Sequence, residues 1–176
     1  MSPIPEEFDD SFQPIIGASV TLRPLRPDDI DIETAFVEGL SAETRANRLL
    51  GGAIRITREY MERLTQVNYE RDMALAATLM LDDRETLIGV ARYALEKDGK
   101  SCEFALVIAD AWQGRGIGHR MLEKLVAVAR TRGVERIYGD TLASNRPLIE
   151  LAKKLGFIPQ RHPDEAYLTR VSLALR

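Results

Sequence analysis

Three glycines at alternating positions after residue 112 are the feature of this sequence with the clearest chemical potential. The run consists of Gln113, Gly114, Arg115, Gly116, Ile117 and Gly118. It lies between a predicted strand over residues 102–109 and a predicted helix over residues 116–132. Without side chains, the glycines leave backbone N–H groups uncovered at the helix start, where unpaired donors and the helix dipole attract phosphate. We expect a phosphate-binding turn with Arg115 as an added charge; the alternative is a plain turn, which needs one glycine rather than three.

The spacing of these glycines narrows the choice of phosphate ligand. A P-loop requires Gly-Lys-Ser/Thr, which the run lacks. A dinucleotide fingerprint requires Gly-x-Gly-x-x-Gly, and here the third glycine comes one residue early. Asp140 lies about 20 residues further on, so a nicotinamide dinucleotide stays open on spacing. That fingerprint usually opens the first βα unit of a larger domain, whereas this run follows several predicted antiparallel strands.

A single carboxylate, Glu103, is the best candidate for a general base. It is the only acidic residue of the predicted strand over residues 102–109, and alternation places it on one face with Ala105, Val107 and Ala109. Small apolar neighbours can raise the pKa of a carboxylate toward the working pH, as deprotonation of an amine through water requires. The alternative is a solvated glutamate at the start of a strand.

Composition excludes several other classes of protein. The chain has 176 residues, 45% of them hydrophobic, and no apolar run approaches the ~20 residues that span a bilayer. One cysteine, Cys102, and two histidines supply too few ligands for a thiolate or histidine metal site. The lone cysteine, together with an acidic start that lacks the features of a signal peptide, predicts a cytoplasmic protein.

The net charge of −3 conceals an uneven distribution. Residues 1–112 carry a charge of −9 and residues 113–176 a charge of +6. An acidic protein does not suit general nucleic-acid binding, for which a strongly basic domain is needed. The basic part suits a local site for a small polyanion, although a solvated basic helix face explains the charge equally well.

The surrounding elements must hold the glycine run and Glu103 in place. Residues 1–16 contain paired acids and prolines and predict a flexible arm, and residues 17–176 predict one domain. Between residues 27 and 67, several short stretches have apolar residues at helical spacing and predict short helices, with Ser41 and Thr57 as candidate caps. Strands and helices are otherwise predicted over residues 20–25, 73–81, 86–95, 102–109, 116–132, 134–142, 145–155 and 166–175. A helix is the alternative for the alanine-rich segment 73–81. An antiparallel meander followed by alternating helices and strands predicts an α/β fold with a mixed, mostly antiparallel sheet between helices.

The run Gln113–Gly118 resembles the acyl-CoA pyrophosphate loop of the GNAT superfamily of N-acetyltransferases, which reads Gln/Arg-x-x-Gly-x-Gly/Ala. The stretch from Asn145 to Phe157 resembles the next helix of that superfamily and its Gly-Phe ending. The resemblance extends over nearly the whole chain. It implies a GNAT fold, acetyl-CoA as the co-substrate with no metal ion, and main-chain contacts from Ile108 and Ala109 to the acyl-pantetheine arm where their strand diverges from its neighbour. For Asn145, a cofactor contact and a simple helix cap are both open.

Three shorter stretches resemble the catalytic domain of Pat-type bacterial protein lysine acetyltransferases: Leu64–Leu75, Glu103–Ala105 and Trp112–Gly116. This narrower resemblance implies that Glu103 is the general base and that the acceptor is a protein lysine. Many members of the superfamily carry a tyrosine that gives a proton to the departing thiolate. This sequence has Ala152 at the matching position, which leaves the general acid unassigned.

Residues 27–70 would cover the acceptor side of such a fold. Acidic residues are frequent there and just beyond: Glu33, Glu38, Glu43, Glu59, Glu62, Glu70 and Asp72. An acidic channel would suit a cationic amine, whereas a solvated helix face explains each charge singly.

Other functions stay open at this point. They are a small-molecule amine acetyltransferase on the same fold, a non-catalytic acyl-CoA sensor, and a nicotinamide-dependent oxidoreductase. A homodimer is a further expectation, formed through the last predicted strand, Tyr167–Leu175, if its edge is open.

Overall fold

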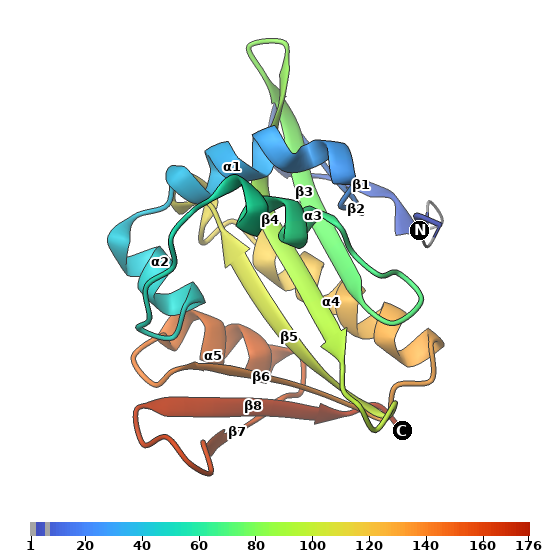
Figure 1. Ribbon diagram of the computed structural model, residues 1–176, viewed down its shortest axis with the longest axis vertical. Coiled ribbons are helices and arrows are strands. Elements are labelled where there is room, and N and C mark those ends of the chain that lie inside the picture. Colours follow the sequence, from blue (N-terminus) through green and yellow to red (C-terminus); the bar gives the residue numbers. More distant parts are fainter. Residues whose placement is uncertain (1–2, 6–7) are drawn as a thin grey trace.

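A single sheet of eight strands forms the centre of the molecule (Figure 1). The computed structural model describes residues 3–5 and 8–176. The strands are β1 (Asp10–Ile15), β2 (Ala18–Pro24), β3 (Met73–Leu81), β4 (Arg84–Leu95), β5 (Ser101–Ile108), β6 (Arg136–Leu142), β7 (Ile158–Arg161) and β8 (Leu168–Ala174). Their order across the sheet is β1-β2-β3-β4-β5-β6-β8-β7. The pair β5–β6 is parallel and the other neighbours are antiparallel, which confirms the mixed, mostly antiparallel sheet.

Helices cover both faces of the sheet (Figure 1). Helices and short 3-10 turns follow in the order η2 (Pro27–Asp29), α1 (Ile30–Glu38), α2 (Ala42–Arg48), α3 (Arg58–Thr65), η3 (Asp110–Trp112), α4 (Ile117–Thr131) and α5 (Arg146–Lys154). The hydroxyls of Ser41 and Thr57 cap α2 and α3, as predicted. One apolar core lies between the sheet and α4 with α5, and a second lies under α1. Within residues 3–5 and 8–176, no helix has the length and apolar character needed to cross a membrane.

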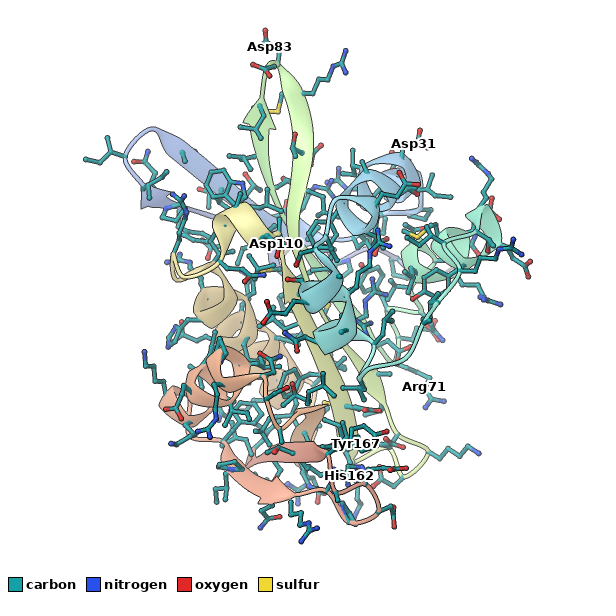
Figure 2. All side chains as sticks on the ribbon, turned by 90° about the vertical axis from the view of Figure 1, so that its left-hand side faces the viewer. Asp31, Arg71, Asp83, Asp110, His162 and Tyr167 are labelled. Carbon is teal, nitrogen blue, oxygen red and sulfur yellow. The ribbon has the colours of Figure 1, made fainter. Side chains whose placement is uncertain are left out.

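The alanine-rich segment is strand β3, as predicted, and not the alternative helix. Its first seven residues are buried, because β3 lies between β2 and β4 with helices over both faces. A strand covered on both faces needs a continuous apolar run rather than an alternating one. The turn into β4 uses Asp82 and Asp83, both with positive φ, as a two-residue hairpin requires. Figure 2 shows Asp83 at the tip of this projecting hairpin.

The two edges of the sheet differ from the predictions. Residues 10–15, part of the expected flexible arm, form β1 and pair with β2. The guanidinium of Arg120 on α4 holds this strand, because it binds the carboxylate of Asp10 at 2.9 Å and lies 4.6 Å from the ring centroid of Phe12. Residues 1–2 and 6–7 of that arm lie outside the described residues.

At the other edge, the short strand β7 was not predicted, because all four of its residues, Pro159 among them, are exposed and show no alternating pattern. It pairs with β8, whose other side pairs with β6. The strand expected to offer an open edge for a second subunit therefore has a neighbour on both sides, and that route to a homodimer is wrong. Figure 2 shows His162 and Tyr167 near the β7–β8 connection.

Strands β5 and β6 separate after a short paired stretch. Three residue pairs join them: Ser101–Arg136, Cys102–Ile137 and Glu103–Tyr138. Strand β5 stays paired with β4 as far as Ile108. Just beyond the last β5–β6 pair, the ring of Phe104 packs against Gly139, where an added Cβ would lie 2.6 Å from the ring. A gap therefore opens along the C-terminal half of β5, next to the glycine run.

A buried ion pair ties the first helices to the sheet. The guanidinium of Arg23 on β2 makes two 2.8 Å hydrogen bonds to the carboxylate of Asp29, and these side chains are only 6% and 7% exposed. Glu85 on β4 accepts further hydrogen bonds from Arg23. Asp29 also accepts from the N–H of Arg26. The hydrogen bond to Asp29 is the largest cause of the raised pKa of Arg23.

Candidate active site

The glycine run forms the turn between η3 and α4. Gly114 and Gly116 have φ angles of +73° and +82°, a region that residues with a side chain rarely adopt. The first hydrogen bond of α4 joins the N–H of Arg120 to the carbonyl of Gly116 at 3.1 Å. The N–H groups of residues 117–119 therefore point out of the helix start. This is the anion-binding geometry that the spacing predicts.

Polar side chains join this turn to α2. The amide of Gln113 donates to the carbonyl of Ile108 at 3.0 Å and to the hydroxyl of Thr44 at 3.2 Å. The carboxylate of Asp110 accepts from the backbone N–H and the hydroxyl of Ser41 and from the hydroxyl of Thr44. These hydrogen bonds lower the pKa of Asp110 to about 2. Figure 2 shows Asp110 near the middle of the molecule, where it connects η3 with the start of α2.

A cleft of about 550 Å³ extends from the glycine turn across β5 to α5. Six of the predicted cofactor-binding residues line it: Ile108, Gln113, Gly114, Gly116, Gly118 and Asn145. Gly118 is also needed for packing, because an added Cβ would lie 3.2 Å from Leu151 on α5. The structure thus brings together most of the site expected from the sequence.

Two other predicted residues lie differently. The side chain of Ile117 is buried in the core, so only its main chain can face a ligand. The guanidinium of Arg115 lies 5.2 Å from the ring centroid of Trp112, a cation–π contact beside the turn. Neither is among the residues that line the cleft in the described part of the chain.

Ala109, predicted to offer main-chain hydrogen bonds to a ligand, has both main-chain groups hydrogen-bonded within the protein. Its N–H donates to the carbonyl of Ile88 and its carbonyl accepts from the N–H of Trp112, each at 2.8 Å. Main-chain groups of an antiparallel ladder alternate in direction. Since Ala109 faces β4, the main-chain groups of Ile108 and Leu106 face the gap beside β6. The alternation thus supports Ile108 and adds Leu106, which the sequence analysis missed.

Asn145 lies at the start of α5 and lines the cleft. Its side-chain amide donates to the hydroxyl of Thr141 at 3.1 Å and makes no cap hydrogen bond to α5. Ala152, two turns further along α5, is fully buried and packs into the core. A tyrosine in its place would need space that the core does not hold.

A second cavity of about 410 Å³ has Glu103 in its wall. The two cavities share Arg48, Phe104 and Ala105 in their walls. Burial is the largest cause of the raised pKa of Glu103, and the nearby carboxylates of Asp140 and Glu96 raise it further. The arginines Arg170 and Arg48 partly oppose this effect. Glu103 thus has the raised pKa expected of a general base.

The prediction of an acidic acceptor side is wrong, because most of these charges are neutralised or absent from the cavity. Glu33 is buried and binds the guanidinium of Arg92 at 2.9 Å. Burial raises the pKa of Glu33 despite this partner. Arginines Arg48, Arg63 and Arg92 line the second cavity, whereas its carboxylates are Asp72 and Glu103.

Another charged cluster at the cleft has no signal in the sequence, because its members are brought together only by the pairing of β6 with β8. The guanidinium of Arg170 binds both carboxylate oxygens of Asp140, at 2.8 and 2.9 Å. His162 Nε2 lies 3.3 Å from Asp140, and His162 Nδ1 accepts from two backbone N–H groups. Although burial would raise the pKa of Asp140, the contacts with Arg170 lower it. Asp140 therefore remains ionised in the wall of the cleft.

The described residues contain neither a metal-binding cluster nor a reactive thiol. No group of three or more His, Cys, Asp or Glu side chains in that part of the chain is placed to hold a metal ion. Cys102 is buried, and this burial raises the pKa of its thiol to about 12. A thiol of that pKa is a poor nucleophile at neutral pH.

Sequence comparisons agree with this geometry. Residues 46–157 match the family model described as the acetyltransferase (GNAT) family. The chain is 35% identical over 159 residues to Acetyltransferase PA5475 of Pseudomonas aeruginosa, covering 90% of this chain and 86% of that protein. It is 27% identical over 153 residues to Acetyltransferase Pat of Mycolicibacterium smegmatis, covering 86% of this chain and 45% of that longer protein.

Solved structures share the fold. The GNAT domain of S. lividans PAT superposes with a TM-score of 0.84 at 24% identity, covering 98% of this chain and 99% of that domain. Spermidine N-acetyltransferase from Vibrio cholerae, solved with CoA and spermine, superposes with a TM-score of 0.70 at 17% identity, covering 89% and 95%. The fold and the family expected from the sequence are confirmed. The chain belongs to the GNAT family of acetyltransferases, which transfer an acetyl group from acetyl-CoA to an amine.

Proposed function

We propose that this protein acetylates the side-chain amine of a protein lysine, with Glu103 as the general base. The proposal is based on one observation: two cavities share Phe104 and Ala105 in their walls. One contains the glycine turn and the other contains Glu103. A donor in the first and an acceptor in the second would meet at β5, which supports direct transfer in a ternary complex.

The donor binds along the larger cleft. The N–H groups of the glycine turn and of residues 117–119 hold the pyrophosphate of acetyl-CoA, and Arg115 adds a positive charge. The main-chain groups of Leu106 and the N–H of Ile108 hold the acyl-pantetheine arm in the gap beside β6, because Gln113 already binds the carbonyl of Ile108. An N–H donor next to the thioester carbonyl stabilises the negative charge that develops on its oxygen.

Transfer then needs three proton movements. Glu103 accepts a proton from the acceptor ammonium through a water molecule, and the neutral amine attacks the thioester carbon. A C–N bond forms, the C–S bond breaks, and the thiolate of CoA leaves. The remaining proton on the nitrogen passes to solvent and the thiolate takes one from solvent, because Ala152 provides no acid.

A protein lysine as the acceptor is supported by the resemblance to Pat-type domains and by the two Pat proteins among the similar ones. Structural likeness to a spermidine enzyme raises a small polyamine as the alternative. Three arginines but only two carboxylates, Asp72 and Glu103, lie in the wall of the acceptor cavity, so it suits an acceptor with a single positive charge better than a polycation.

The test uses labelled acetyl-CoA with dialysed host lysate and, separately, with a host metabolite extract. Wild type runs beside Glu103→Gln, with Glu70→Gln as a control because Glu70 is exposed and outside both cavities. We expect label on protein lysines, reduced at least about 100-fold in Glu103→Gln and unchanged in the control. Label in a small amine alone would agree with acetyl-CoA as the donor and would contradict a protein lysine as the acceptor.

We further propose that residues 17–176 form a single domain to which β1 adds an edge strand. A cytoplasmic location suits the lone, buried thiol of Cys102. Fractionation of cells that express the tagged protein tests this location.

A further inference from the structure

Two residues, Arg48 and Ala105, line all three cavities described around the site, and Arg48 is the charged one. It is the last residue of α2 and lines the donor cleft, the acceptor cavity and a third, narrower cavity beneath α1. It therefore lies where the acetyl donor and the acceptor meet, on the opposite side from β5.

The other arginines of this region have partners. Arg92 binds Glu33 and the carbonyl of Leu64, and Arg45 donates to two backbone carbonyls at the end of α1. The guanidinium of Arg63 lies 3.9 Å from Glu59. By contrast, Arg48 makes no side-chain hydrogen bond or ion pair within residues 3–5 and 8–176. A partly buried guanidinium without a partner is costly, so this position favours an anionic ligand.

The electrostatic setting agrees with this. Burial and then the neighbouring charge of Arg92 lower the pKa of Arg48, and Tyr60, Glu33 and Glu103 only partly oppose this effect. Arg48 and Glu103 also influence each other's pKa, so they act on the same enclosed space. That space thus has a proton acceptor on β5 and an unpaired cation on α2.

We infer that the acceptor of this enzyme carries a carboxylate close to its reactive amine, and that Arg48 binds this carboxylate while Glu103 receives the proton of the amine. The inference rests on the proposed function and defines its substrate class. In a protein, the carboxylate belongs to an Asp or Glu beside the lysine. In a free amino acid, it is the substrate's own carboxylate. A planar guanidinium suits either, because it donates two parallel hydrogen bonds to a carboxylate.

The phosphates of acetyl-CoA are the competing partner for Arg48, since it also lines the donor cleft. In that cleft Arg48 is one of the residues that the acceptor cavity shares, with Phe104 and Ala105, whereas the anion-binding N–H groups lie at the glycine turn. The two roles differ in a measurable way: a phosphate contact changes the KM for acetyl-CoA, and an acceptor contact changes the KM for the acceptor.

The experiment compares matched acceptors by following release of the CoA thiol. One pair is a lysine peptide flanked by glutamates and the same peptide flanked by glutamines. The other pair is an α-amino acid and its amide. We expect wild type to prefer the carboxylate member of the pair that it accepts by about tenfold in kcat/KM. Arg48→Gln should abolish this preference and leave the KM for acetyl-CoA within about twofold of wild type.

Two further variants serve as a control and as a test of the guanidinium geometry. Arg58→Gln is the matched control, because Arg58 is an exposed arginine paired with Glu62 outside the cavities. Arg48→Lys retains the charge without the planar fork, and we expect it to keep part of the preference. It also replaces Arg48→Gln if that variant shows a lowered melting temperature.

The outcomes separate the inference from the proposed function. Equal rates on both members of each pair, or an Arg48→Gln effect confined to acetyl-CoA, would overturn the inference and leave lysine acetylation standing. An Arg48-dependent preference among amino acids only would support the inference and overturn the lysine acceptor. If nothing is acetylated, calorimetric binding of the same acceptors to Glu103→Gln decides, because a carboxylate preference in binding needs no turnover.

Discussion

The side-chain amide of Gln113 donates a 3.0 Å hydrogen bond to the carbonyl oxygen of Ile108. This carbonyl belongs to the last residue of β5, on the side that has lost its pairing with β6. The hydrogen bond joins the first residue of the glycine run to the end of the open strand, and both residues line the cleft. Gln113 therefore positions the phosphate site relative to the thioester site.

Replacing this amide tests that role. In Gln113→Leu, the Ile108 carbonyl and the Thr44 hydroxyl lose a donor, so the KM for acetyl-CoA should rise about tenfold. Gln160→Leu on the exposed strand β7 is the control and should leave that KM unchanged. Steady-state kinetics with varied acetyl-CoA measures both. An unchanged KM in Gln113→Leu would show that the turn holds its position without the amide.

The left-handed conformation of Gly116 predicts a selective loss of binding. Gly116→Ala meets no atom within 4 Å, so its cost is backbone strain of about 1–2 kcal/mol, relieved by distortion of the turn. Gly99→Ala has the same kind of strain, with φ of +66° and open space, in the hairpin between β4 and β5. We expect similar losses in melting temperature from both. Only Gly116→Ala should weaken acetyl-CoA binding, as measured by calorimetry.

The raised pKa of Glu103 predicts how activity depends on pH. A general base works in its ionised form, so kcat/KM should fall as the pH is lowered through a pKa above the ordinary 4.5 of a glutamate. Glu96 is one cause of the raised pKa, and Glu96→Gln removes its negative charge. The acidic limb of the profile should therefore move to lower pH in Glu96→Gln. A limb that stays in place or moves upward would contradict the assignment of this limb to Glu103.

The buried pair of Arg23 and Asp29 predicts a large effect on stability. Asp29→Ala leaves a buried guanidinium with Glu85 as its remaining carboxylate, so the free energy of unfolding should fall by about 3 kcal/mol. The exposed pair of Arg58 and Glu62 is the control, and Glu62→Ala should cost at most about 1 kcal/mol. Denaturant unfolding of both variants measures the difference. Equal costs would mean that the buried pair contributes no more than a surface pair.

Some helix ends and strands were predicted correctly because their own residues carry a recognisable pattern. The segment 73–81 was predicted as a strand from its length and apolar run, and the caps at Ser41 and Thr57 follow from residue type alone. Strand β7 was missed because its four exposed residues are ordered by pairing with β8, which no local pattern encodes. Pairing also decides that the N–H of Ala109 points to β4, since the direction of a main-chain group depends on the register with that strand.

The candidate site was predictable where the chemistry lies in consecutive residues. The glycine run and Glu103 belong to this class. The charge of the acceptor side was not predictable from the sequence. The net charge left by seven carboxylates depends on which arginines fold against them, as the pair of Glu33 and Arg92 illustrates. Thr44 and Arg48 lie far from the motif in sequence and reach the cleft only through tertiary contacts, such as the hydrogen bond from Thr44 to Asp110.

The three residue pairs between β5 and β6 also have a mechanical meaning. Glu103 belongs to the last of these pairs, so it lies at the vertex of the wedge that the two strands enclose. When one half of a wedge rotates about its vertex, the mouth moves much further than the vertex. The opening for the donor can thus widen and narrow during binding and release while the carboxylate of Glu103 stays nearly fixed.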